Sequence, residues 1–306
     1  MQNYQELWEN RSSIRTRPRK EIDFNQNGLF FPPEKQLLLL LPEINTLGEN
    51  AKNEILLLSL YKYLNDIVNL ETKLIVEACN YIINDNSLVK YPQETKLNAY
   101  TIIIDEYYHV YIAQDMLNQL NSKFPTIPKL KLPDSDANEA VLYMKTKIQP
   151  QYVKVFEIIA VCIFETTVVR ELVEFFKDPQ VHPSIRHYVN DHMNDEAKHY
   201  NFFYDLLIYT WSSLPNDCKE NLGTYLATFV KLYLRTESDK NYNISILENI
   251  FKDEIKAKKI VEKIYKGFDI SIDMPIVRNV LTVLKKANIL NYPAVKQGFI
   301  NSNLYF

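Results

Sequence analysis

Glycine is scarce in this sequence, with 5 residues among 306. The loops that hold phosphate groups in nucleotide-binding folds need clustered glycines, and neither GxGxxG nor GxxxxGKS or GxxxxGKT occurs. We therefore expect neither a dinucleotide-binding enzyme nor a P-loop enzyme. Because glycine is a poor helix former but common in turns, the same scarcity favours a helical fold.

Cysteine and surplus charge are scarce as well. The three cysteines form no CxxC pair, so we expect neither a disulfide framework nor a zinc knuckle, and the reducing cytoplasm is the expected compartment. Lysine and arginine total 35 against 38 acidic residues, which gives a net charge of -3. This balance provides no positive field for phosphates or anionic lipid, so we expect no nucleic-acid partner.

Long hydrophobic runs are also missing. Clean apolar runs such as residues 37–41 are far too short to span a bilayer. Residues 1–20 lack the apolar core of a signal peptide. We therefore expect a soluble cytoplasmic protein that does not bind membranes. The basic residues between Arg11 and Lys20 are followed at once by acidic residues, a pattern that predicts a solvated arm.

The sequence is rich in apolar residues, 46% of the chain, that recur with the period of an α-helix. This pattern predicts an all-α fold. The expected long helices cover about residues 49–84, 92–121, 150–178 and 183–212, and three further helices cover 217–235, 244–266 and 272–288. A proline-rich connection over 122–136 and a short helix over about 137–148 lie between the second and third long helices.

The strongest chemical signal is a D-E-x-x-H pattern that occurs on two of the predicted long helices. It places Glu106 before His109 and Glu196 before His199. A Glu and a His three residues apart project from one helix face, so each pair offers a carboxylate oxygen and an imidazole nitrogen to one point. Ferritin-like di-metal bundles combine two such pairs with a single Glu from each of two other helices.

Glu71 and Glu165 are the candidates for those single carboxylates. Each lies among apolar residues of a predicted long helix, where an unpaired charge is strongly disfavoured without a cation. Their spacing from the two motifs fits two helical hairpins joined by the proline-rich crossover. We therefore predict a ferritin-like four-helix bundle over residues 49–212, with a helical C-terminal extension over 213–306 packed on it in a single domain, 1–306.

A third histidine is predicted to face the metals. His192 lies four residues before Glu196 and shares its helix face, so its imidazole points toward the same site. His182 precedes a proline in a predicted loop, and His187 lies off this face. We expect His182 and His187 to lie outside the site.

Asp105 and Asp195 are candidates for orienting the ligand histidines, because each directly precedes a predicted ligand glutamate. A histidine that binds a metal usually donates its other ring N–H to a carboxylate, which fixes the tautomer. Across the bundle, we expect Asp105 to accept from His199 and Asp195 to accept from His109.

These residues together resemble the p-aminobenzoate N-oxygenase family of ferritin-like di-iron oxygenases. The resemblance covers roughly residues 50–210, and the chain length and the additional C-terminal helices are similar too. It places the family's metal ligands, four carboxylates and three histidines, on Glu71, Glu106, His109, Glu165, His192, Glu196 and His199.

The resemblance implies a centre of two iron ions with O2 as co-substrate. Two ferrous ions then reduce O2 to a peroxo-diferric species, which oxidises an amine to hydroxylamine and onward to nitroso or nitro. No flavin or iron–sulfur signature occurs in the sequence, so we expect an external electron donor. Carboxylate and imidazole ligands suit manganese as well as iron, so manganese stays possible.

The expected substrate is an amine, of aryl type by the resemblance, that acts in biosynthesis either as a free small molecule or bound to a carrier protein. Asp66 lies above Glu71, where a basic side chain would be wanted for a substrate carboxylate, which argues against p-aminobenzoate itself. We also expect a homodimer. The residues predicted to line the substrate pocket are Tyr63, Ile67, Ala113, Val168 and Val169.

Other protein classes share parts of this pattern. A ribonucleotide reductase small subunit is largely excluded, because its radical tyrosine would fall on Ala113. A di-iron desaturase or C–H hydroxylase is the alternative enzyme, although acyl-carrier desaturases lack a counterpart of His192. A ferritin-like iron-binding protein is the non-enzymatic alternative, although an iron store needs no third imidazole. Manganese catalase or another di-manganese protein stays open on the ligands alone.

Overall fold

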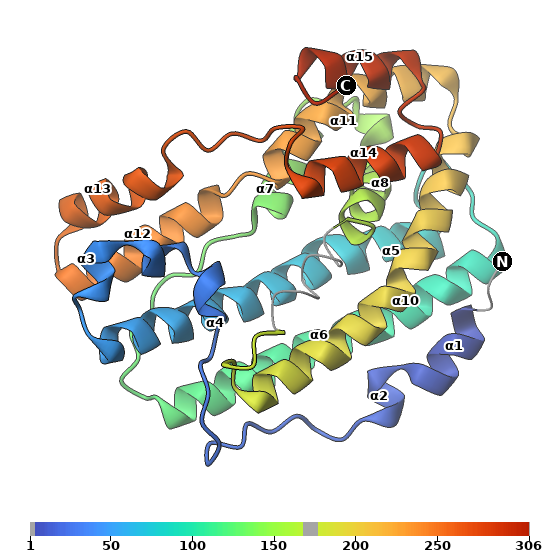
Figure 1. The fold of residues 1–306 in the computed structure, drawn as a ribbon. Helices are drawn as coiled ribbons and strands as arrows, with labels where there is room; N and C mark the ends of the chain where they lie inside the picture. The colour runs from blue at the N-terminus through green and yellow to red at the C-terminus, as the bar shows by residue number, and fades with distance from the viewer. Residues whose placement is uncertain (1–3, 168–176, 306) are drawn as a thin grey trace.

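The computed structural model describes residues 4–167 and 177–305 of the chain. These residues form an all-α protein (Figure 1), as the sequence predicts, and their only β-type pairing is an isolated bridge between Leu29 and Val181. Within these two ranges, no helix combines the length and the apolar character that crossing a membrane requires.

Four long helical segments form the bundle. The first consists of α4, a π-helical turn called η3, and α5, and it packs against α6; α8 packs against α10. Neighbours in sequence therefore pack as pairs, as two hairpins do. The bounds are Glu49–Leu70 for α4, Glu71–Ile75 for η3, Val76–Ile83 for α5, Gln93–Lys123 for α6, Val153–Glu165 for α8 and Pro183–Ser213 for α10.

The π turn begins at Glu71. The backbone N–H of Val76 donates to the carbonyl of Glu71, five residues earlier, so the helix is wider here than an α-helix. Turns of this kind occur often at functional sites. The hydrophobic pattern predicts a continuous helix over 49–84 but carries no signal for this local widening.

The third bundle helix is shorter than predicted, because α8 ends at Glu165 and a turn follows at Thr166 and Thr167. The Thr166 hydroxyl donates to the carbonyl of Cys162 at 2.6 Å, and the Thr167 hydroxyl donates to that of Ile163 at 2.7 Å. Threonines that bond to the preceding turn destabilise and bend a helix. The prediction of a helix through to residue 178 was therefore wrong at 166–167, and its continuation over 168–176 lies outside the described residues.

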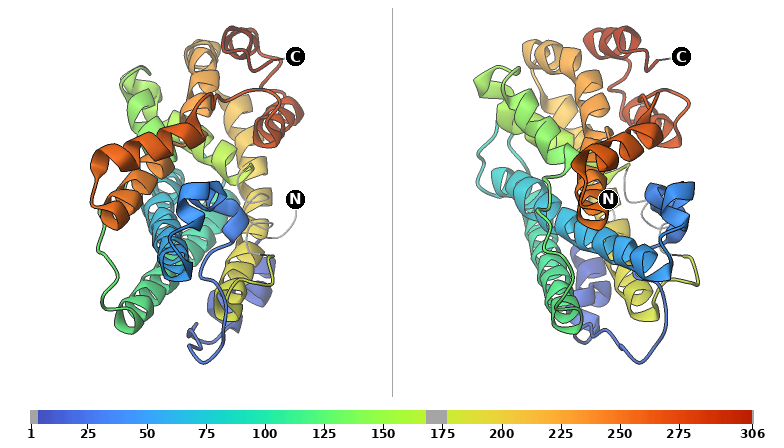
Figure 2. Two further views of the ribbon diagram at one scale, coloured as in Figure 1. Left: turned by 60° about the vertical axis from the view of Figure 1, so that its left-hand side comes forward. Right: turned by 90° about the vertical axis from the view of Figure 1, so that its left-hand side faces the viewer.

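Shorter elements surround the bundle, and Figure 2 shows α11, α14 and α15 gathered at one of its ends. Three of these elements, η1, η2 and η4, are single 3-10 turns. The bounds are Tyr4–Arg11 for α1, Ser13–Thr16 for α2, Pro33–Lys35 for η1, Leu37–Leu40 for η2, Pro42–Asn45 for α3, Asp136–Lys145 for α7, Pro150–Tyr152 for η4, Asn216–Tyr233 for α11, Glu237–Phe251 for α12, Glu254–Tyr265 for α13, Pro275–Lys286 for α14 and Pro293–Asn301 for α15.

The helix predicted over 244–266 is in fact two helices. Lys252, directly after α12, adopts the left-handed conformation with φ of 55°, which ends the helix. Asp253 then caps α13, because its carboxylate accepts the backbone N–H of Lys256 at 2.9 Å. Helix α15 and the N-terminal elements were not predicted, because short helices contain too few turns for a clear periodic signal.

The arginines of the basic N-terminal stretch are exposed, as its charge pattern predicts, but the stretch itself packs on the bundle and buries Lys20. Helices α1 and α2 lie along α6 and α10 (Figure 1). Ser12 and Ser13 are buried, and Lys20 is buried in an ion pair with Asp191 of α10. Arg17 lies 3.3 Å from the same carboxylate. We call residues 4–20 the N-terminal arm, and it covers the boundary between α6 and α10.

Two apolar clusters fill the bundle, and a polar layer separates them. One cluster lies between α4, the first half of α10 and the second half of α6, and the other extends to the C-terminal helices. The polar layer lies where the chain passes from one cluster to the other, between Ile67 and Leu74 on the first segment, between Ile102 and Ile112 on α6, and between Val189 and Phe202 on α10. Glu165, at the end of α8, belongs to the same layer.

Candidate metal centre

The polar layer contains the predicted ligands, all buried with exposed fractions of 6% or less. They form two groups of four residues, and in each group the possible ligand atoms lie within 4.8 Å of one another. Glu196 belongs to both groups, so the two groups share one carboxylate. The first group is Glu71, His109, His192 and Glu196, and the second group is Glu106, Glu165, Glu196 and His199.

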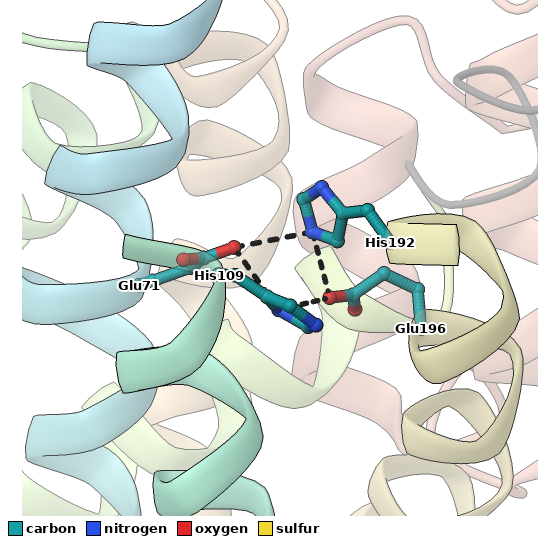
Figure 3. A group of neighbouring side chains, drawn as sticks. All are labelled: Glu71, His109, His192 and Glu196. Atoms are coloured by element: carbon teal, nitrogen blue, oxygen red, sulfur yellow. Dashed lines mark hydrogen bonds and ion pairs between the residues drawn. The ribbon is translucent and has the colours of Figure 1, made fainter. Parts of the chain in front are cut away.

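Figure 3 shows the first group, which joins η3, α6 and α10. Nε2 of His192 lies 3.2 Å from Oε1 of Glu71 and 3.0 Å from Oε1 of Glu196. Nδ1 of His109 lies 3.5 Å from the same oxygen of Glu71 and 3.4 Å from that of Glu196. Two carboxylates and two imidazoles therefore face one point.

The second group joins α6, α8 and α10. Nδ1 of His199 lies 3.1 Å from Oε1 of Glu106 and 3.3 Å from Oε2 of Glu196. Oε2 of Glu106 lies 3.5 Å from Nδ1 of His109, in the first group. Glu106 and Glu196 therefore each reach histidines of both groups, which is the position of a carboxylate that can bridge two ions.

Many possible ligand atoms of both groups have no hydrogen-bond partner among the described residues, although Nε2 of His192 and Oε1 of Glu196 form a hydrogen bond of 3.0 Å. Buried polar atoms in folded proteins normally have hydrogen-bond partners, so unsatisfied atoms aimed at one place need a different kind of partner. Two divalent cations fit this donor set, because carboxylate and imidazole are their common ligands and four positive charges balance four carboxylates. Within the described ranges, the buried atoms of the ligand groups with no hydrogen-bond partner include Oε2 of Glu71, both carboxylate oxygens of Glu106, Oε2 of Glu165, and Nδ1 of His109 and His199.

The carboxylates also perturb one another electrostatically. Burial, together with the charges of Glu196 and Glu106, raises the pKa of Glu165 well above its usual value. Burial raises the pKa of Glu71 too, although hydrogen bonds from histidines oppose the shift. Carboxylates this close together in apolar surroundings favour protonation unless a cation compensates their charge. The raised pKa values of these carboxylates are therefore a second indication, besides the unsatisfied polar atoms, that the site binds cations.

Asp105 and Asp195 lie next to ligand histidines of the opposite helix. Nε2 of His109 lies 3.2 Å from Oδ2 of Asp195, and Nε2 of His199 lies 3.4 Å from Oδ2 of Asp105. In both rings Nδ1 faces the ligand groups, and the N–H at Nε2 can be donated to an aspartate. This arrangement sets the tautomer and the direction of each imidazole.

Two residues with no predicted role hold Asp105. The indole Nε1 of Trp8 donates to Oδ1 of Asp105 at 2.8 Å, and the hydroxyl of Ser12 donates to the same oxygen. Both residues belong to the N-terminal arm and are more than ninety positions from Asp105 in sequence. No local spacing in the sequence could have indicated these contacts.

Asp195 is held by charge as well as by hydrogen bonds. Nζ of Lys198 donates to its Oδ1 at 2.6 Å, and the backbone N–H of Ser13 donates to the same oxygen at 3.2 Å. Burial alone would raise the pKa of Asp195, but His109 and Lys198 outweigh that effect and hold the pKa well below its usual value. Asp195 is therefore ionised and suited to accept the N–H of His109. The spacing of Lys198, three residues after Asp195, was a signal that the sequence analysis did not use.

His192 is oriented differently from the other two ligand histidines. In the part of the chain that the structure describes, its Nδ1 has no hydrogen-bond partner, and no aspartate fixes its tautomer. The ring of Tyr188, one turn earlier on α10, lies 6.1 Å from the His192 ring. Burial and the charges of Glu71 and Glu196 raise the pKa of the Tyr63 hydroxyl, which places Tyr63 close to this side of the site. Aromatic rings therefore line the His192 side of the layer.

The two remaining histidines lie outside both ligand groups. Nδ1 of His182 accepts the backbone N–H of Ser184 at 3.2 Å, and its ring stacks on Phe30 with 5.6 Å between the ring centres. The side chain of His187 is 64% exposed and lies 3.6 Å from a carboxylate oxygen of Asp191.

The residues predicted for a substrate pocket have different positions. Tyr63 lines a cavity between α4 and α12. Ile67 and Ala113 are buried in the same apolar cluster against which Tyr63 packs. Val168 and Val169 lie outside the described residues.

Comparison with known families agrees with this geometry. A family model described as P-aminobenzoate N-oxygenase AurF matches residues 2–261, a span that includes both ligand groups and the N-terminal arm from Tyr4. No curated protein matches the chain. The chain therefore belongs to the p-aminobenzoate N-oxygenase family, which consists of non-haem di-iron oxygenases.

Proposed function

We propose that this protein is an O2-dependent N-oxygenase that converts an arylamine to a hydroxylamine and onward to a nitroso or nitro compound. The observation that carries the proposal is the pair of buried ligand groups, which share Glu196 and include the third imidazole of His192. Family membership supports the same reaction class. The amine is either free or bound to a carrier protein.

The proposed metal is iron, bound as a pair of ions. The first group offers two carboxylates and two imidazoles, and the second offers three carboxylates and one imidazole. Such oxygen-rich sets suit iron or manganese better than copper or zinc. Iron would supply the reductive activation of O2 that an amine oxidation needs. Metal analysis of protein expressed with both metals present distinguishes iron from manganese.

The proposed reaction requires electrons from outside the chain. In the first oxidation, an amine, O2, two electrons and two protons give a hydroxylamine and water. One oxygen atom forms the new N–O bond, and the other leaves as water. The sequence has no flavin or iron–sulfur signature, so the proposal includes a separate electron donor.

The protein's own contribution is to orient the ligands and to exclude water. Asp195 and Asp105 hold the rings of His109 and His199 with Nδ1 toward the ligand groups. The apolar clusters on both sides of the layer keep water away, which strengthens electrostatic interactions inside it. The arm donates to both aspartates and so supports the site from outside the bundle.

A single-turnover experiment tests the proposed reaction. The iron-loaded chain is reduced under argon, mixed with 4-methylaniline, and exposed to O2. We expect the hydroxylamine, nitroso or nitro product by mass spectrometry, with 18O incorporated from labelled O2. Consumption of O2 without any nitrogen oxidation, over a panel of arylamines, would contradict the proposal.

Removal of a shared carboxylate is expected to remove both ions. Glu106→Ala and Glu196→Ala should each lower the metal content from two ions per chain to nearly none, because each carboxylate reaches histidines of both groups. Metal analysis after iron loading measures this. His187→Ala is the control and should retain two ions, since that side chain is exposed. One tightly bound ion in either glutamate variant would show that the two groups bind independently.

Asp195→Asn is expected to weaken metal binding by about 10- to 100-fold, the usual effect of losing the partner of a ligand histidine. The substitution preserves the shape of the side chain but removes the charge that favours the N–H of His109 at Nε2. Competition with a chelator measures the affinity. Asp115→Asn on α6 is the matched control, because Asp115 pairs with Arg19 at the surface. Equal affinities of the two variants would contradict a positioning role for Asp195.

His192→Ala distinguishes the N-oxygenase from a desaturase or an iron-binding protein, which assemble their centres without this histidine. We expect the variant to bind two irons and to lose at least roughly 100-fold in amine oxidation, about 2.7 kcal/mol of transition-state stabilisation. The reason is that a neutral imidazole adds a strong donor without adding negative charge. Iron content and the single-turnover rate are measured on the same sample. Wild-type turnover would show that His192 is a packing residue.

A further inference from the structure

A cavity of about 300 Å³ lies beside α4, between that helix, α12 and the segment around η1 and η2. Its volume is in the range of small-molecule sites. Several polar side chains face it from two helices, which is the pattern of a binding site with a few orienting groups in a partly apolar wall. The residues that matter for its chemistry are Lys62, Tyr63, Asp66, Asp239, Tyr242 and Asn243.

Tyr63 connects this cavity with the candidate metal centre. Its side chain lines the cavity, and its hydroxyl is buried close enough to Glu71 and Glu196 for their charges to raise its pKa. Phe31, another lining residue, belongs to the same apolar cluster as Tyr188, which packs against His192. Tyr63 therefore forms the side of the cavity that is nearest to the first ligand group.

Among the described lining residues, the one buried cation is already shared between two acids. Nζ of Lys62 lies 2.6 Å from Oδ2 of Asp66 and 2.9 Å from Oδ1 of Asp239. Lys35 also lines the cavity, but its side chain is exposed. Within the described residues, the charged lining therefore consists of two acids, half-buried Asp66 and exposed Asp239, and two lysines, buried Lys62 and exposed Lys35. A ligand carboxylate placed beside Asp66 would therefore meet a buried cation that two acids already share.

One carboxylate oxygen of Asp66 accepts no hydrogen bond from the described residues. Its Oδ1 is buried and has no hydrogen-bond partner among the described residues. Burial raises the pKa of Asp66 to about 6, and Asp239 and Asp136 add to the shift, whereas Lys62 opposes it. An unsatisfied buried carboxylate oxygen costs free energy, and a positively charged donor placed against it recovers that cost.

We propose that this cavity binds the end of the substrate opposite the reacting amine, and that this end carries a cationic nitrogen that donates to Oδ1 of Asp66. This inference rests on the proposed function, because the reacting amine then points past Tyr63 toward the ligand groups. The substrate class is an arylamine with a second, protonated amine. Asp66 thereby selects against aryl carboxylates such as p-aminobenzoate.

Three probes with the same ring test the charge preference. 4-(Aminomethyl)aniline carries a cation, p-aminobenzoate carries an anion, and 4-methylaniline is neutral at the same ring position. Isothermal titration calorimetry on the iron-loaded chain under argon measures binding without turnover. We expect 4-(aminomethyl)aniline to bind at least roughly tenfold more tightly than either other probe, a difference of about 1.4 kcal/mol.

Two variants test whether the carboxylate of Asp66 causes the preference for the cationic probe. Asp66→Asn keeps the shape of the side chain and should lower the affinity for the cationic probe about tenfold, leaving 4-methylaniline unchanged. Asp134→Asn is the matched control, because Asp134 pairs with Lys73 and does not line the cavity, and it should leave all three affinities unchanged. Thermal unfolding of each variant verifies that it folds.

The wild-type comparison keeps the test decisive even if Asp66→Asn does not fold. Equal or tighter binding of p-aminobenzoate, or binding of no probe, overturns the inference. An unchanged affinity of folded Asp66→Asn for the cationic probe overturns it as well. Because binding is measured without O2, the expected selectivity together with no amine oxidation would overturn the proposed function and leave the cavity assignment in place.

Discussion

The burial of four glutamates in one layer of a helical bundle is the constraint on which the rest of the structure depends. An ionised carboxylate in apolar surroundings costs several kcal/mol unless another charge compensates it. Apolar clusters on both sides of the layer exclude water, so the carboxylates gain little from solvent. The same exclusion strengthens their attraction for cations. A layer that is unfavourable by itself is thus a strong binding site for two divalent ions.

Charge compensation also needs correctly directed ligands, and the two D-E-x-x-H helices provide this for each other. The aspartate of each helix faces the histidine of the other, through His109 with Asp195 and His199 with Asp105. These contacts join α6 to α10 at the level of the ligands. The N-terminal arm then covers both aspartates and donates to them. A segment with no ligand of its own thereby helps to direct the ligand rings.

The helix that carries Glu71 has two chemical roles on different faces. Glu71 belongs to the first ligand group, while Lys62 and Asp66 of the same helix line the cavity beside it. Tyr63 lies between these faces and also lines the cavity. If the cavity binds the substrate as proposed, a change at Asp66 alters the preferred substrate without changing a ligand. Metal chemistry and substrate choice are then separable within one helix.

The sequence by itself determined the helical class, the long helices and the candidate ligands, because these depend on spacings of three to seven residues along one helix. These spacings did not predict the π turn at Glu71 or the end of α8 at Glu165. At both places, hydrogen bonds to the preceding turn change the course of the helix. Only the tertiary structure decided which distant groups meet. Trp8 reaches Asp105 across 97 positions, and Asp66 shares Lys62 with Asp239 of α12. Such contacts depend on how whole helices pack, and no local pattern in a single sequence encodes that packing.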